Sequence, residues 1–225
     1  MATGATPLSR IRRLPDALVN KIAAGEVVER PASAVKELVE NALDAGATAI
    51  AVELRDGGAA LVRVTDDGVG MSAEELPLAL ERHATSKLTT DEELDAIATL
   101  GFRGEALAAI CAVSRFTVTS RARDAAEGLR LAGEGGKVTQ QLAVPAEVGT
   151  TVEVHDLFFN TPARLKFLKA PATELSASLR IVGQLALFSG PDEGVLDELR
   201  RADVDRITPL EALSLLAELK KRLER

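Results

Sequence analysis

The alternation of apolar and polar positions predicts six β-strands. Residues 48–54 and 60–66 alternate in this way and flank the turn sequence Asp56-Gly57-Gly58, so they are expected to form a hairpin. Shorter alternating segments follow at residues 113–121, 128–133, 136–144 and 149–157, separated by Gly-containing or charged turns. Short strands at this spacing favour a mostly antiparallel sheet.

Helical periodicity predicts a second layer, with helices expected at residues 16–24, 31–45, 72–80 and 104–111. Pro31 suits the first turn of the second helix, and Gly46 can end it in the left-handed conformation. From Leu175 onward only helical periodicity remains. The expected fold class is α+β, a two-layer α/β sandwich followed by a helical tail. The expected divisions are a flexible arm (1–14), one domain (15–174) and the helical tail (175–225).

Composition narrows the class of protein. Aromatic residues make up only 3% of the chain, so the core is expected to consist of Leu, Val, Ile and Ala. Cys111 is the only cysteine, which excludes an internal disulfide, and no apolar run approaches the roughly 20 residues of a membrane span. We expect a cytoplasmic protein with no membrane contact. The net charge of -7 argues against strong binding to duplex DNA, so DNA contact is expected to be weak or indirect. A small basic cluster has two interpretations, structural packing or DNA contact: Arg164, Lys166 and Lys169.

Four polar residues of the segment AVKELVENALDAGA share one predicted helix face, because they lie at positions i, i+3, i+4 and i+7: Glu37, Glu40, Asn41 and Asp44. One interpretation is a solvated helix face. The other interpretation is a cation site. Three acidic side chains on one helix face without a basic partner repel one another, and a bound cation would reduce this repulsion. Carboxylate and amide oxygens suit Mg²⁺, which commonly arrives with substrate phosphates.

The segment DDGVGM, residues 66–71, allows three interpretations. Gly68, Gly70 and Ala73 match the dinucleotide-binding pattern, but the preceding strands read as a hairpin, which argues against a parallel unit. A plain Asp-Gly turn without function is the second interpretation. In the third, Asp66 accepts a hydrogen bond from the exocyclic amine of adenine, and the glycines let the base approach the backbone.

Two later segments carry groups that suit phosphate. In LGFRGEAL, two glycines bracket an arginine and open a predicted helix, whose free N–H groups can face an anion: Gly101, Arg103 and Gly104. HATSK adds two hydroxyls and a lysine: Thr85, Ser86 and Lys87. A plain loop is the alternative for each segment. The P-loop pattern is absent from the sequence.

Taken in order, these motifs resemble the GHKL superfamily of ATPases, and within it the N-terminal ATPase domain of the MutL mismatch-repair family. NKIAAGEVVERPASAVKELVENALDAGAT, DDGVGM, RHATSKL, GFRGEAL and GTTVEVHDLFFNTPARLKFLK carry the resemblance over roughly residues 8–172. It implies a GHKL (Bergerat) sandwich that uses ATP and Mg²⁺, with Glu37 as general base and Asn41 as metal ligand. The implied nucleotide-binding residues are Asp66, Gly70, Thr85, Ser86, Lys87, Gly101, Arg103, Gly104 and Thr150.

The chain departs from that family after about residue 188, where VDRITPLEALSLLAELKKRL resembles the C-terminus of MutS. In a MutL N-terminal half a second domain supplies a lysine to the γ-phosphate, and we do not expect the residues after about 188 to form that domain. Two functions are therefore expected: a slow Mg-ATPase acting as a conformational switch in mismatch repair, or an inactive nucleotide-binding module whose tail tethers partners. The implied partners are a second copy on ATP binding and MutS-like proteins. Residues 184–188 read either as a peptide that docks into the sliding clamp or as part of a helix.

Overall fold

The computed structural model describes residues 24–25, 27–81 and 106–188. The chain divides into two compact units, Met1–Leu179 and Arg180–Arg225. The expected arm at residues 1–14, most of the expected first helix and the tail beyond residue 188 lie outside the described residues. The candidate functional site belongs to the first unit.

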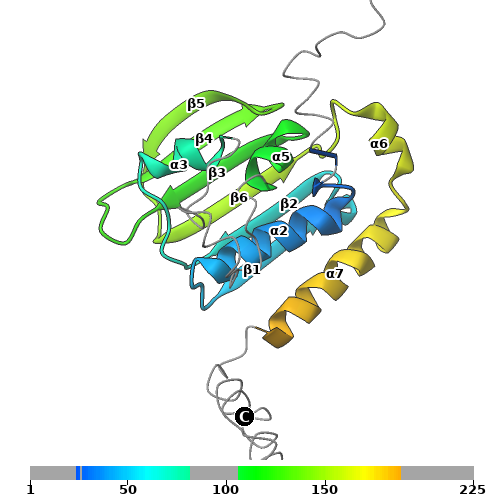
Figure 1. The fold of residues 1–225 in the computed structure, drawn as a ribbon, viewed down its shortest axis with the longest axis horizontal. Helices are drawn as coiled ribbons and strands as arrows, with labels where there is room; N and C mark the ends of the chain where they lie inside the picture. Colours follow the sequence, from blue (N-terminus) through cyan, green and yellow to red (C-terminus); the bar gives the residue numbers. More distant parts are fainter. Residues whose placement is uncertain (1–23, 26, 82–105, 189–225) are drawn as a thin grey trace, which may run out of the picture. The chain divides into compact units, whose positions relative to one another are not determined.

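A six-stranded sheet forms the centre of the first unit (Figure 1). Its order is β1-β2-β6-β3-β4-β5, and every neighbouring pair is antiparallel. All six predicted strands are present: β1 (Ile50–Arg55), β2 (Leu61–Asp66), β3 (Arg115–Arg121), β4 (Gly128–Glu134), β5 (Lys137–Val144) and β6 (Gly149–His155). The late strand β6 lies between β2 and β3, an arrangement that local patterning does not specify.

The helices confirm the predicted second layer. Figure 1 shows α2 (Pro31–Asp44) and α5 (Ala106–Ala112) over one face of the sheet, and α3 is shorter than expected, at Glu75–Ala79. Pro31 stands in the first turn of α2, and Gly46 follows the helix with φ +70°. A 3-10 turn, Asp56–Gly58, joins β1 to β2, and α6 (Pro162–Phe167) and α7 (Pro171–Phe188) complete the described chain.

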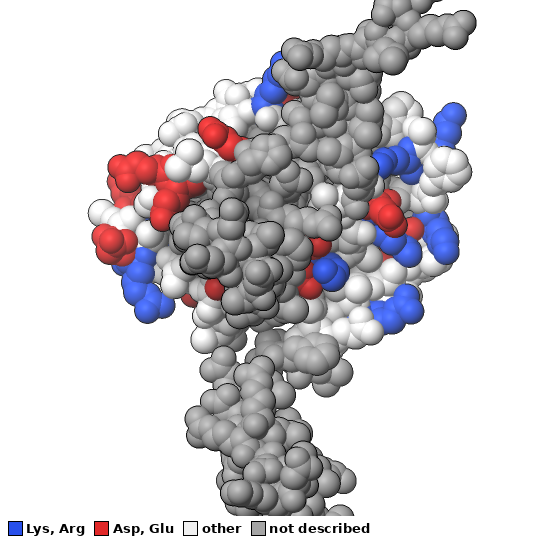
Figure 2. Space-filling view, viewed as in Figure 1, with Lys and Arg blue, Asp and Glu red and all other residues white. Residues whose placement is uncertain are grey.

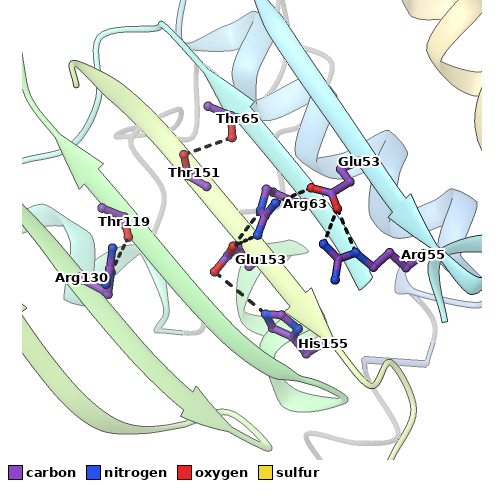
Figure 3. Close-up of polar contacts among 9 residues, drawn as sticks. All are labelled: Glu53, Arg55, Arg63, Thr65, Thr119, Arg130, Thr151, Glu153 and His155. Carbon is purple, nitrogen blue, oxygen red and sulfur yellow. Dashed lines mark hydrogen bonds and ion pairs between the residues drawn. The ribbon is translucent and has the colours of Figure 1, made fainter. Parts of the chain in front are cut away.

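Alternation along the strands separates a buried face from an open one. Val64 of β2, Val152 of β6 and Val118 of β3 form one buried cross-strand row. Neighbouring positions point to the opposite face, where Arg63 lies between Glu53 and Glu153 and contacts both carboxylates (Figure 3). Because these charges are partly exposed and water screens them, each pair contributes little to stability.

The first turn of α7 is tied to the residue that precedes α2. Glu174 is 3% exposed, and its Oε2 accepts hydrogen bonds from Arg30 Nε (3.0 Å) and Nη2 (2.8 Å). Lys169 N donates to the other carboxylate oxygen at 3.0 Å. Because α7 runs without a break from residue 171 to 188, the expected boundary at residues 174 and 175 falls inside a helix. Residues 184–188 are the last five of that helix, and clamp docking stays a prediction.

Arg164 of the basic cluster has a structural role. Its Nη1 donates to the Val28 carbonyl at 2.8 Å, and its guanidinium lies where a side chain at Gly25 would stand. Figure 2 shows Lys and Arg side chains over α6 and acidic side chains over α3. DNA contact by Lys166 and Lys169 stays a prediction. None of the helices in the described part of the chain is long and apolar enough to cross a membrane.

Candidate functional site

Asp66 and Thr150, the two residues predicted to bind adenine, meet at the end of the buried row. They are register partners in β2 and β6. Asp66 Oδ1 accepts hydrogen bonds from the N–H groups of Thr150 (3.2 Å) and Gly68 (3.0 Å), and no described residue donates to Oδ2. Burial raises the pKa of the Asp66 carboxyl above its ordinary value, and the two backbone hydrogen bonds partly oppose this shift.

Asp67 points away from Asp66 and has a different task. Its carboxylate accepts hydrogen bonds from the Thr48 hydroxyl (2.6 Å) and from the N–H groups of Thr48 (2.7 Å) and Ala49 (2.8 Å). These bonds, with the Thr48 hydroxyl first, lower the pKa of Asp67. Asp67 therefore holds the entry of β1 against the exit of β2, which leaves Asp66 as the candidate site carboxylate of the pair.

The DDGVGM loop is fastened to the end of α2. Val69 N donates to the Ala45 carbonyl at 3.0 Å, and a side chain at Gly68 would come within 2.8 Å of Ala45. This contact joins the loop after Asp66 to the helix that carries Glu37 and Asn41. The dinucleotide interpretation of the loop is wrong, because β1 and β2 form an antiparallel hairpin.

Gly70 is required for a reason that the sequence did not suggest. Its φ is +68°, and a Cβ at this position would lie 2.0 Å from the Arg121 carbonyl oxygen. The missing side chain thus leaves room for the last carbonyl group of β3. Access for the nucleotide, the role expected from the resemblance, stays a prediction.

A pair of glycine variants tests this reason. Gly46 has almost the same φ, +70°, but a Cβ at Gly46 would meet no described atom within 4 Å. Gly46→Ala is expected to cost about 1–2 kcal/mol of unfolding free energy from backbone strain alone. Gly70→Ala is expected to cost about 1–3 kcal/mol more, because the methyl group meets fixed backbone. Urea denaturation of both variants measures the difference, and equal losses would contradict the steric argument.

The polar face of α2 is only partly as expected. Glu37 and Asn41 are half-buried and Asp44 is exposed, but Glu40 is 4% exposed. The interpretation of three acids without a basic partner is wrong, because Lys36 Nζ lies 3.0 Å from Glu40 and 3.6 Å from Glu37. Lys36 stands one helical turn before Glu40, the spacing of a stabilising pair. Glu40 is therefore a structural residue beside the candidate base.

One buried hydroxyl in the site was missed. Ser120 is 1% exposed and is the β3 register partner of Thr150. Its signal in the sequence is a polar residue where Phe116 and Val118 predict a third apolar position. The expected phosphate-binding residues lie outside the described part of the chain: Thr85, Ser86, Lys87, Gly101, Arg103 and Gly104.

Comparison with known proteins decides the family. A family model described as "Histidine kinase-, DNA gyrase B-, and HSP90-like ATPase" matches residues 29–146 of the 225. The chain belongs to this ATPase family. The expected resemblance to GHKL ATPases is thereby confirmed, together with the expected fold class.

Relatives within this ATPase family are mismatch-repair proteins. The DNA mismatch repair protein MutL of Geobacter sulfurreducens is 59% identical over 178 residues, which cover 79% of this chain and 29% of that protein. MutL of Geotalea daltonii is 54% identical over 184 residues, 82% of this chain and 31% of that protein. The chain thus spans less than a third of the length of these two relatives, and its resemblance to MutL is confirmed over that part.

Solved structures agree with the ATPase family assignment. The "Aquifex aeolicus MutL ATPase domain complexed with ADP" has a TM-score of 0.57 and 37% identity, covering 72% of this chain and 56% of that one. The "N terminal domain of a DNA repair protein" has a TM-score of 0.62 and 29% identity, covering 75% of this chain and 48% of that one. The resemblance of the tail to MutS stays a prediction.

Proposed function

We propose that this chain binds Mg-ATP and hydrolyses it slowly, as a conformational switch in DNA mismatch repair. The observation that carries the proposal is the polar end of the buried row. There Asp66 turns a half-buried carboxylate toward the site, beside the loop fastened to α2. Membership of the ATPase family and similarity to a MutL ATPase domain complexed with ADP support a nucleotide at this position.

In this proposal the sheet binds the base and helix α2 carries the catalytic carboxylate. Asp66 and Thr150 bind the adenine from the sheet, and Gly70 lies in the loop beside them. Glu37 takes a proton from the attacking water, as a carboxylate on a half-buried helix face can do. The set Thr85, Ser86, Lys87, Gly101, Arg103 and Gly104 is proposed to bind the phosphates.

The donor chemistry of α2 fits a magnesium ion. Asn41 offers an amide oxygen one helical turn from Glu37, and Mg²⁺ accepts few protein ligands when phosphates supply the rest. Within the described residues no group of three or more His, Cys, Asp or Glu side chains could hold a metal. Asn41 would hold the Mg²⁺, which would neutralise charge on the transferred phosphate group.

The wider role follows from the relatives. Their names place them in DNA mismatch repair, which supports MutS-like proteins as proposed partners. The resemblance adds a second copy of the chain on ATP binding as a proposed partner. A sliding clamp at residues 184–188 is a further proposed partner. An inactive nucleotide-binding module is the second candidate function.

Titration calorimetry of the intact chain with Mg-ATP, combined with a phosphate-release assay, tests the proposal. We expect ATP and ADP to bind, GTP to bind more weakly, and phosphate to be released slowly. Omission of Mg²⁺ should weaken triphosphate binding more than binding of the adenosine moiety. Binding without release would favour the inactive module, and absence of binding would overturn both functions.

A further inference from the structure

Ser120 is one of three polar side chains that lie in a cross-strand row next to the buried valine row. Asp66, Thr150 and Ser120 are cross-strand partners on β2, β6 and β3, one step beyond the valine row Val64, Val152 and Val118. Ser120 lies at the inner end of this row and is 1% exposed. A buried hydroxyl must satisfy its hydrogen-bonding groups within the protein.

The contacts of Ser120 assign the direction of each hydrogen bond. The Ser120 hydroxyl donates to the Gly149 carbonyl at 3.0 Å, because a carbonyl oxygen can only accept. Its oxygen accepts from Met71 N at 2.8 Å. Thr150 Oγ1 lies 2.8 Å from the same oxygen. Since the single proton of Ser120 is already given to Gly149, Thr150 must be the donor in this pair.

The proton of Thr150 therefore points inward, and its hydroxyl oxygen can only accept from the site. Asp66, as a carboxylate, also only accepts. The two side chains together present acceptors to a nucleotide base. The exocyclic amine of adenine can donate hydrogen bonds to these acceptors. The carbonyl oxygen of guanine cannot donate, so it would face the Asp66 carboxylate and the Thr150 oxygen without a hydrogen bond.

We propose that Ser120 is a positioning residue that sets base selectivity, by fixing the Thr150 hydroxyl as a hydrogen-bond acceptor toward the nucleotide. The inference rests on the proposed function, because it requires an adenine nucleotide beside Thr150. Ser120 also holds Met71 and Gly149, so it joins the loop after β2 to the start of β6. Removal of its hydroxyl would free the Thr150 proton to turn toward the site.

A double-mutant cycle with ADP and GDP as probes tests this role. Loss of one hydrogen bond corresponds to roughly a threefold to tenfold change in Kd. We expect Ser120→Ala to raise the Kd for ADP by about that factor and to lower the GDP/ADP ratio of Kd values at least about threefold. In a Thr150→Val background, Ser120→Ala should have little further effect on this ratio. Thr150→Ser, which keeps the hydroxyl, should retain the wild-type ratio.

A matched control separates this role from general packing. Ser114 is also fully buried, and its hydroxyl donates to the Ile110 carbonyl at 2.8 Å. Ser114→Ala should leave the GDP/ADP ratio unchanged. If Ser120→Ala does not fold, Ser120→Cys is the alternative variant. Its side chain is similar in size, but its sulfur is a poorer hydrogen-bond acceptor, so it should also lower the GDP/ADP ratio of Kd values.

Two results would overturn the inference. Equal effects of Ser120→Ala with and without the Thr150 hydroxyl would show that Ser120 acts only on the backbone of Met71 and Gly149. An unchanged GDP/ADP ratio would show that the Thr150 proton does not contribute to selectivity. Failure of the proposed function is distinguishable, because the wild-type chain would then bind neither probe.

Discussion

Replacement of Glu37 by alanine is expected to lower ATP turnover by roughly 100- to 10,000-fold, the usual contribution of a positioned general base. Binding of Mg-ATP should remain within about threefold of wild type, because the lost carboxylate acts on water and leaves the adenine contacts intact. The measurements are phosphate release under saturating ATP and calorimetric Kd. Glu37→Gln, which keeps the shape, should be equally inactive.

Asp44 provides a matched control on the same helix. It lies seven residues further along α2, on the same face, and is exposed. Asp44→Ala removes a carboxylate of the same helix without touching the proposed base, and turnover should stay near wild type. Turnover that survives in Glu37→Ala would remove Glu37 from the mechanism. Equal losses in both variants would point to helix stability instead.

The Arg30→Ala variant is expected to lose about 3–5 kcal/mol of unfolding free energy, because it leaves the buried Glu174 carboxylate without its charged partner. Arg30 supplies both side-chain hydrogen bonds to Oε2 of Glu174, whose side chain is only 4% exposed. Lys169 N still donates to Oε1, but one oxygen of a buried charge is left without a partner. Denaturant unfolding at neutral pH measures the loss.

The complementary variant, Glu174→Ala, should lose less unfolding free energy than Arg30→Ala. In Glu174→Ala the remaining Arg30 side chain is 33% exposed, so its charge can reach water. The exposed pair Arg55–Glu53 serves as the control: Arg55 is 67% exposed, and Arg55→Ala should cost less than about 1 kcal/mol. If Arg30→Ala and Arg55→Ala lose similar amounts, the buried pair does not anchor α7.

Local elements of the fold were predictable because they depend on local patterns. All six strands and the α2 helix follow from alternation, the Asp-Gly turn and the positions of Pro31 and Gly46. The strand order was not predictable from these signals, because β6 pairs with β2 and β3 across long stretches of chain. Such pairing depends on which side chains fit across strands, and alternation alone does not encode it.

The site was predictable in outline through the resemblance, and its finer chemistry was not. Asp66 and Thr150 come together as expected, because they are register partners. The pairing of Lys36 with Glu40 was missed because Lys36 lies outside the set of four polar positions that share one helix face. Ser120 was missed because alternation with Phe116 and Val118 marks it only as an inward-facing position, and its contact with Thr150 depends on the pairing of β3 with β6.

The place of β6 has a consequence for how the chain folds during synthesis. Asp66 and Thr150 are 84 residues apart, and β2 and β3 can join one sheet only when β6 has inserted between them. A nascent chain that has emerged only as far as β5 would carry the β1–β2 hairpin and a separate three-stranded β3–β4–β5 sheet, both with exposed edges that can pair with other chains. The candidate nucleotide-binding pair Asp66 and Thr150 therefore forms only after β6 has emerged, in the same step that joins the two parts of the sheet.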